Sequence, residues 1–121
     1  MTPEETVNAF CDAIATGDLD KIVGYFSADA TYHNIPMAAV QGTDAIRATL
    51  ASFMAPETKV TFEVKHQAVN GDVVLNERVD VFTTGDKVIS IPVIGTFEVH
   101  DGKITAWRDY FDLNMFMSQL T

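Results

Sequence analysis

Residues 70–86 read NGDVVLNERVDVFTTGD, a segment with the pattern of a β-strand between two turns. Its centre, 73–82, has the pattern of a β-strand, and glycine-containing turn signals bound it at 70–72 and 84–86. Arg78 and Asp80 lie two residues apart in this strand, so both side chains project from one face. Charges in a strand of a small domain are costly to bury unless they are paired. This face is therefore either wet, or it carries a charged pair placed inside for chemistry.

The segments on either side of this strand have the same period of two. Apolar and polar residues alternate from Lys59 to Ala68, and a further turn signal, His-Asp-Gly-Lys, occupies 100–103. We therefore expect four consecutive strands, joined by hairpin turns, that form an antiparallel meander.

The first half of the chain has helical periodicity instead. Thr2 and Glu5 flank a proline in the pattern of a capping box, and the apolar stripe that follows ends at 16–17. A second short helix is expected at 19–26, where it should pack against the first as a hairpin. A strand follows at 28–35, a third helix at 44 to about 54, and a final short helix or tail at 113–120.

This order of elements predicts an α+β fold in a single domain spanning residues 1–121. We expect a strongly curved mixed, mainly antiparallel sheet, closed by the N-terminal helices into a cone with an internal pocket. Several strands are apolar on both faces, which a sheet wrapped around such a pocket would explain.

Composition excludes several classes of partner. The formal net charge is −9, with 8 Lys plus Arg, so neither nucleic acid nor an anionic membrane surface is an expected partner. The longest apolar run, around 88–97, is too short to cross a membrane and is interrupted. Cys11 is the single cysteine, and no Cys/His spacing of a zinc site occurs. No metal or cofactor is expected, and the acidic N-terminus, which opens directly into a helix, favours a cytoplasmic protein.

A pair of buried acids is predicted from the faces of two strands. On the last strand Asp109 shares a face with Trp107 and Phe111, where a carboxylate would be desolvated and its pKa raised unless a cation compensates. Arg78 is such a cation, because its planar fork can bridge two carboxylates. We predict an Asp80–Arg78–Asp109 array, which can hold the two acids in different protonation states.

Tyr32 and Asn34 form a second polar pair, on the strand at 28–35. A phenol and an amide two residues apart can hold one water molecule from two directions. With a carboxylate as the third partner, that water would be oriented and made nucleophilic without a metal.

Each of these signals also has a plainer interpretation. Arg78 and Asp80 could form a salt-bridge ladder on a solvated face, Asp109 could lie at the surface, and the Tyr32 pair could be a strand end entering a turn. Among the histidines, His66 is in phase with the apolar side of its strand and is a candidate for the cavity. The other two face away from the pair or lie in a turn.

Taken together, these residues resemble the limonene-1,2-epoxide hydrolase family, whose cone-shaped fold is shared with ketosteroid isomerases and nuclear transport factor 2. The likeness covers nearly the whole chain in element order. It is sharpest at 32–34 (Tyr-His-Asn), 76–80 (Asn-Glu-Arg-Val-Asp) and 107–112 (Trp-Arg-Asp-Tyr-Phe-Asp). No departure occurs at the five polar positions.

The resemblance implies opening of an epoxide by water in one step, without a metal or a covalent intermediate. Asp109, with Tyr32 and Asn34, would hold and deprotonate the water. Asp80 would donate its proton to the epoxide oxygen, and Arg78 would bridge the two aspartates. The product would be a vicinal diol.

The expected substrate is lipophilic, because the residues assigned to the pocket are apolar. The residues predicted to bind it are Met37, Leu50, Phe53, Met54, Ile89, Ile91, Trp107 and Phe111. Five more would line or back the pocket, namely Ile35, Val74, Phe82, Met115 and Phe116. A core role for most of these residues is equally open.

Two other functions fit the same fold. One is a ketosteroid-isomerase-like or polyketide-cyclase-like enzyme that acts through an enolate, with Tyr32 and the two aspartates in recast roles. The other is a non-catalytic domain that binds a small molecule. Folds of this kind commonly pair through the outer face of the sheet, and Ile104, Ala106 and Tyr110 would suit a homodimer there.

Overall fold

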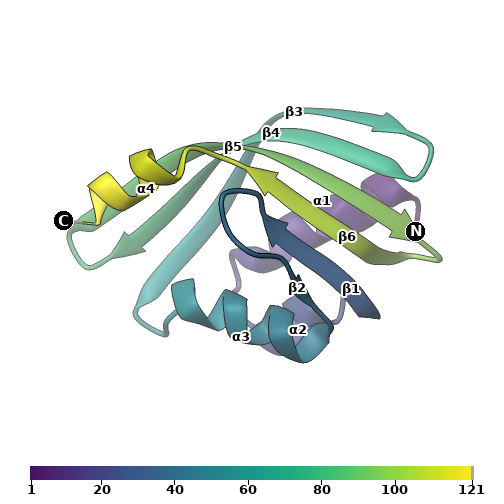
Figure 1. The fold of residues 1–121 in the computed structure, drawn as a ribbon, viewed down its shortest axis with the longest axis horizontal. Helices are drawn as coiled ribbons and strands as arrows, with labels where there is room; N and C mark the ends of the chain where they lie inside the picture. Colours follow the sequence, from purple (N-terminus) through teal and green to yellow (C-terminus); the bar gives the residue numbers. More distant parts are fainter. Residues whose placement is uncertain (121) are drawn as a thin grey trace.

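The computed structural model describes residues 1–120, and Figure 1 shows the order of its elements. The helices are α1 (Pro3–Ile14), α2 (Leu19–Val23), α3 (Thr43–Phe53) and α4 (Leu113–Gln119). The strands are β1 (Phe26–Asn34), β2 (Val40–Gln41), β3 (Thr58–Asn70), β4 (Val73–Thr84), β5 (Lys87–His100) and β6 (Lys103–Tyr110). The predicted α+β class and the four-strand meander, β3 to β6, are confirmed.

The six strands form one mixed sheet in the order β2-β1-β6-β5-β4-β3. Neighbours are antiparallel except for β1 and β6, which run parallel. In that parallel pair Tyr32 lies opposite Trp107, and Asn34 lies opposite Asp109. The sheet therefore places the first long strand beside the last one, although their sequence positions are far apart.

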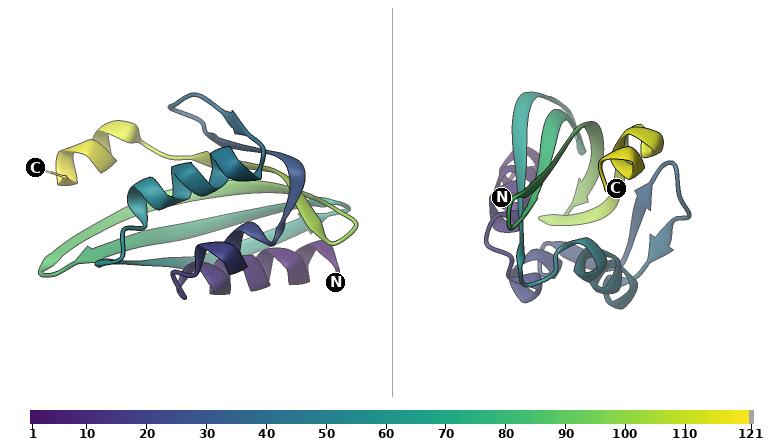
Figure 2. Two further views of the ribbon diagram at one scale, coloured as in Figure 1. Left: turned by 90° about the horizontal axis from the view of Figure 1, so that it is seen from below. Right: turned by 90° about the vertical axis from the view of Figure 1, so that its left-hand side faces the viewer.

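The long strands β3, β4 and β5 bend, and the first three helices lie on the side toward which the sheet curves (Figure 2). Helix α1 begins with the predicted capping box, in which Thr2 and Glu5 exchange hydrogen bonds. Helix α4 lies apart from the other helices, against β5, and so stands at the other side of the cone's opening. The helices and the curved sheet together enclose the space in which the polar residues of β4 and β6 lie.

The indole of Trp107 lies at the centre of the core. Its ring stacks on Tyr32 with 4.0 Å between centroids and on Phe97 with 5.8 Å, and the edge of Phe10 from α1 packs against it at 5.0 Å. Aromatic pairs of this kind contribute roughly 0.5–1.5 kcal/mol each beyond the area they bury. The same indole thus joins α1, β1, β5 and β6, the elements that support one wall of the cone.

The second helix is shorter than predicted. It ends at Val23 with Gly24 as its C-cap, and Phe26 belongs to β1 instead, where it pairs with Ile104. Glycine is a poor helix former, and Phe26 is buried in the core as a strand residue. The two-residue strand β2 was not expected at all, since so short an edge strand leaves no periodic pattern.

Two bulges change which residues face inward, and each corrects a prediction. The register of β3 shifts between Val64 and His66, so His66 is exposed rather than in phase with the cavity. The register of β6 shifts near its start, and Ile104, predicted for the outer face, is fully buried in the core. The alternation of residues along a strand therefore predicts which face of the sheet each side chain occupies only where strand pairing is regular.

No helix within residues 1–120 combines the length and the apolar character needed to cross a membrane.

Candidate active site

Arg78 joins two carboxylates inside the protein. Its Nε and Nη2 donate to Oδ1 and Oδ2 of Asp80, both at 2.9 Å, and Nη2 also donates to Oδ2 of Asp109 at 2.9 Å. The arginine is 0% exposed and each aspartate is 4% exposed. The predicted array is therefore present as a geometric unit, with a two-point contact to one acid and a one-point contact to the other.

Pairing across β5 explains how these residues meet. Arg78 and Asp80 point inward from β4 at alternate positions, and Asp109 points inward from β6. The strand between them, β5, contributes Gly95, which pairs with Asn76 of β4 and with Asp109 of β6. The long side chain of Arg78 spans this middle strand.

Other side chains complete the hydrogen bonding of the array. Nη1 of Arg78 donates to Oδ1 of Asn76 at 3.1 Å, and Nε1 of Trp107 donates to Oδ1 of Asp109 at 2.7 Å. The guanidinium carbon also lies 4.4 Å from the ring centroid of Phe62, a cation–π contact. Buried charges are stable only with such partners.

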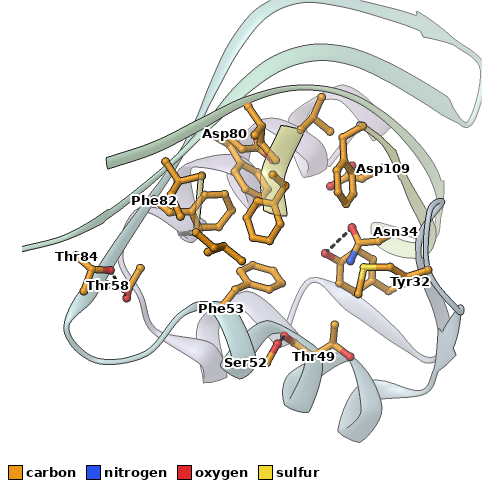
Figure 3. A pocket seen from close by; sticks show the side chains of 18 residues that line it. Tyr32, Asn34, Thr49, Ser52, Phe53, Thr58, Asp80, Phe82, Thr84 and Asp109 are labelled. Atoms are coloured by element: carbon orange, nitrogen blue, oxygen red, sulfur yellow. Dashed lines mark hydrogen bonds between the residues drawn. The ribbon is translucent and has the colours of Figure 1, made fainter. Parts of the chain in front are cut away.

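Tyr32 and Asn34 lie beside this array on β1. The phenol of Tyr32 donates to Oδ1 of Asn34 at 3.2 Å, and both residues line the same pocket as Asp80 and Asp109. The parallel pairing with β6 sets Asn34 next to Asp109. Figure 3 shows both polar residues on the Asp109 side of the pocket. The structure thus brings together the four pocket-facing residues predicted for catalysis and sets Arg78 behind the two aspartates.

Burial and neighbouring charges shift the pKa values of the site residues in different ways. Burial raises the pKa of Asp80 to about 6, against the lowering effect of Arg78. Burial alone would lower the pKa of Arg78, but the negative charges of Asp109 and Asp80 raise it above its ordinary value. Burial also raises the pKa of Tyr32 well above its ordinary value. At neutral pH the phenol therefore keeps its proton, and Asp80 has a proton affinity unusually high for a carboxylate.

The array opens into a cavity of about 400 Å³ whose wall is mostly apolar. Phe53 of α3 and Phe82 of β4 face into it, and Thr58 with Thr84 lie on the side away from Asp109 (Figure 3). A cavity of this size holds a small organic molecule. The chemistry available is therefore the transfer of protons to and from a lipophilic molecule.

Five of the eight residues predicted to bind substrate line this cavity: Met37, Phe53, Ile89, Ile91 and Phe111. The other three, Leu50, Met54 and Trp107, belong to the buried core instead. Leu50 faces the core from α3 with no exposed surface, and Met54 is buried at the end of that helix. Trp107 is enclosed by aromatic rings and reaches the site through its bond to Asp109.

Several lining residues were not predicted. Phe62, Val93 and Leu120 add apolar surface, and alternation with Ile89 and Ile91 on β5 could have found Val93. The polar lining residues Thr49, Ser52, Thr58 and Thr84 carry no pattern that would single them out. Asn76, two residues before Arg78 on the same face of β4, could have been found by that spacing but was given no role in the array.

Possible metal ligands do not gather in the described part of the chain: no three His, Cys, Asp or Glu side chains within residues 1–120 converge as a metal site requires. Arg78 would also repel a cation from the carboxylates, since it donates to both of them. The two aspartates are held by the guanidinium as a hydrogen-bonded group.

Fold and site together define a class of protein: a small cone-shaped α+β domain whose pocket contains two carboxylic acids bridged by one arginine. The model of the limonene-1,2-epoxide hydrolase catalytic domain matches residues 1–121. The chain is also 36% identical over 117 residues to epoxide hydrolase EphG of Mycobacterium tuberculosis, covering 94% of this chain and 76% of that protein. The chain therefore belongs to the limonene-1,2-epoxide hydrolase family.

One solved structure agrees with this assignment, and a second shares the fold. A structure of a limonene-epoxide-hydrolase-like epoxide hydrolase from M. tuberculosis superposes with a TM-score of 0.84 at 30% identity, over 96% of this chain and 86% of that one. A candidate polyketide cyclase from Xanthomonas campestris pv. campestris gives a TM-score of 0.85 at 20% identity, over 98% and 96% of the two chains. The second likeness shows the fold alone.

Proposed function

We propose that this protein adds water to a lipophilic epoxide in one step and releases a vicinal diol. The observation that carries the proposal is the shared Nη2 of Arg78, which lies 2.9 Å from both Asp80 and Asp109 at the wall of an apolar cavity. An acid and a base that act on one C–O bond must face the same space from different strands. Asp80 on β4 and Asp109 on β6 meet this requirement.

In the proposed reaction Asp109, Tyr32 and Asn34 hold one water molecule, and Asp109 takes a proton from it. The water oxygen forms a bond to an epoxide carbon while the C–O bond to the ring oxygen breaks. Asp80 delivers its proton to that oxygen, so the product gains one water in total and no ester with the protein forms. The proton on Asp109 then returns to Asp80, and Arg78 bridges the two acids during this exchange.

The high proton affinity of Asp80 supports its role as the acid. A general acid works best when its pKa lies near the working pH, and burial raises the pKa of Asp80 to about 6. Asp109 accepts N–H bonds from Arg78 and Trp107, and these hold the carboxylate of the proposed base in one orientation at the cavity wall.

The test is an epoxide panel in ¹⁸O-labelled water under single-turnover conditions. We expect label in the diol from the first turnover, because water attacks the substrate directly. Label that appears in the protein carboxylates instead would show a covalent ester and would overturn the mechanism. No diol from any lipophilic epoxide would overturn the function.

A second function on the same residues is enolate chemistry of the kind polyketide cyclases and ketosteroid isomerases perform. It is favoured by the raised pKa values of Tyr32 and Asp80, because the phenol keeps its proton at neutral pH and Asp80 holds one below about pH 6, so that both can donate to an oxyanion. This alternative predicts deuterium exchange at the α-carbon of a ketosteroid, with no diol from epoxides.

We also propose that the protein is a cytoplasmic homodimer. The outer face of the sheet exposes Leu75, Ile94 and Tyr110, of which the last two are directly paired across β5 and β6. Contiguous apolar residues on a sheet face favour association. The free thiol of Cys11 suits a reducing compartment, and fractionation of the source cells would test the location.

A further inference from the structure

Gly95 occupies the interior of a regular strand, where glycine is unfavourable. It lies on β5 between Asn76 and Asp109, and its backbone does not adopt the left-handed conformation that favours glycine. A glycine inside a strand weakens it by about 0.5–1 kcal/mol relative to alanine. Backbone conformation therefore does not explain why position 95 is a glycine. The explanation must lie in the atoms that surround it.

That space is taken by the guanidinium of Arg78. A Cβ atom on Gly95 would lie 3.0 Å from Oδ1 of Asn76 and 3.0 Å from Oδ1 of Asp109, and closer still to Nη1 of Arg78. Real Cβ atoms essentially never come as close to a heavy atom as this one would to Nη1, and the two 3.0 Å contacts are tighter than nine in ten real Cβ contacts. The absent side chain is what lets Arg78 cross β5 and reach the carboxylate of the next strand.

Asn76, the residue paired with Gly95 on β4, also holds the guanidinium. Its Oδ1 accepts from Nη1 of Arg78, while its Nδ2 donates to Oε1 of Gln67 at 3.2 Å. Gln67 in turn donates to Oδ1 of Asn8 on α1 at 2.8 Å. Because Nδ2 is held by Gln67, the oxygen of Asn76 faces Arg78, and the 1% exposure of Asn76 leaves it little solvent to bond instead.

We propose that Gly95 and Asn76 are positioning residues for the epoxide hydrolysis proposed above: Gly95 leaves the space for the guanidinium, and Asn76 orients it, so that one nitrogen of Arg78 spans both aspartates. Neither residue lines the cavity, so they act through Arg78 and not on the substrate. The inference rests on the proposed function.

The main test is Gly95→Ala, measured by kcat and KM on an epoxide that the wild-type protein hydrolyses. The methyl group displaces Nη1 and with it the bond between Nη2 and one or both aspartates. We expect kcat to fall on the order of a hundredfold, the scale of a small misplacement of a catalytic group, while KM changes less than about twofold. The control is Val88→Ala, an exposed position on the same strand, which should retain both values.

The pH profile separates positioning from a general loss of stability. Arg78 lowers the pKa of Asp80, so its displacement raises that pKa, and the alkaline limb of the kcat profile moves to higher pH in Gly95→Ala. In a variant that is merely less stable, the alkaline limb of the kcat profile stays at the same pH as in the wild type. An unmoved limb together with an unchanged kcat would overturn the inference.

Two further variants keep the test decisive if Gly95→Ala folds poorly. Asn76→Leu has nearly the same shape but no acceptor, and we expect kcat to fall about tenfold at constant KM, the scale of one hydrogen bond. In an Arg78→Lys background, Gly95→Ala should cause a much smaller further loss of residual rate and stability, since lysine lacks the atom that makes the closest clash. Equal losses in both backgrounds would contradict the role of Gly95.

A measurement without turnover distinguishes this inference from the proposed function. The Nε–H of Arg78 is buried and bonded to Asp80, so its ¹H–¹⁵N signal should be protected from exchange in the wild type and lost or shifted in Gly95→Ala. If the wild type makes no diol but this signal responds, the function fails and the positioning stands. If the wild type makes diol but the signal and kcat do not respond, the inference fails.

Discussion

At the scale of single residues, the two aspartates differ through their hydrogen-bond partners. Asp80 accepts two N–H bonds, both from Arg78, whereas Asp109 accepts one from Arg78 and one from Trp107. The indole bond ties Asp109 to the rigid core, while Asp80 depends on the arginine alone. The proposed base is therefore held by two different side chains, and the position of the proposed acid is set by Arg78.

Isosteric replacement of either acid tests the proposed roles. Asp109→Asn removes the base and Asp80→Asn removes the transferable proton, so each should lower kcat about a hundredfold or more. The measurement is initial-rate kinetics with purified protein. Asp112→Asn is the control, because asparagine also caps a helix well and Asp112 caps α4. Full turnover in either array variant would disprove its assigned role.

The pH dependence of kcat follows from the sign of the shift on Asp80. Its pKa is raised to about 6, so the proton needed for catalysis is bound below pH 6 and lost above it. We expect kcat to fall about tenfold per pH unit on the alkaline side, the slope of a single ionisation. Because the two acids share one guanidinium, the profile reports values of the pair. A rate that rises from pH 6 to 8 would contradict the acid role.

At the scale of elements, regular alternation was enough to predict the site's two central strands. On β4 and β6 the predicted inward residues Arg78, Asp80 and Asp109 are the buried ones. No glycine or proline marks the bulge in β3 in the sequence. The face on which His66 lies could therefore not be predicted from the two-residue alternation alone. The parallel pairing of β1 with β6 likewise leaves no local pattern. Spacing and side-chain chemistry suggested that Tyr32 and Asn34 hold a water molecule, but only the resemblance to a family linked them to Asp109.

Helix α3 shows why the apolar pattern alone could not separate pocket from core. Its apolar residues Leu50 and Phe53 lie three positions apart and so on neighbouring parts of one helical face, yet Leu50 is enclosed in the core and Phe53 lines the cavity. The distinction depends on where the sheet curves away from the helix. Hydrophobic periodicity predicts that one face of a helix is shielded from water. It does not predict whether other side chains or a bound ligand shield that face.

The two residues should therefore respond differently to truncation. Leu50→Ala should lower the free energy of unfolding by about 2–5 kcal/mol through loss of packing and a cavity, with KM nearly unchanged. Phe53→Ala should raise KM several-fold with a smaller effect on stability. Urea denaturation and steady-state kinetics on both variants check this, and a large rise in KM for Leu50→Ala would show that Leu50 contacts substrate.

At the scale of the whole molecule, the two faces of the sheet differ in the residues they carry. The inner face carries the array and the cavity, and the outer face exposes the apolar residues Leu75, Ile94 and Tyr110. These positions alternate with the site residues along the same strands. Association through the outer face would therefore leave the cavity accessible.

The proposed dimer can be tested by a charge on that face. Ile94→Lys places an ammonium group among apolar neighbours, and we expect it to convert the dimer to a monomer. Light scattering after size-exclusion chromatography gives the mass of each species directly. Lys87→Ala, at the far end of the same strand, is the control. A wild-type protein that elutes as a monomer at high concentration would rule out the dimer.

The parallel contact between β1 and β6 also governs the order in which this protein can acquire its shape. During synthesis β1 leaves the ribosome 75 residues before the part of β6 that pairs with it, from Ala106 to Asp109. Contacts of such long sequence separation form slowly, because the loop must close before they stabilise the chain. Until then Tyr32 and Trp107 cannot stack and the array lacks one acid. A nascent chain halted before residue 103 should therefore be inactive and sensitive to proteases. Activity and protease resistance should appear together, once β6 has been synthesised.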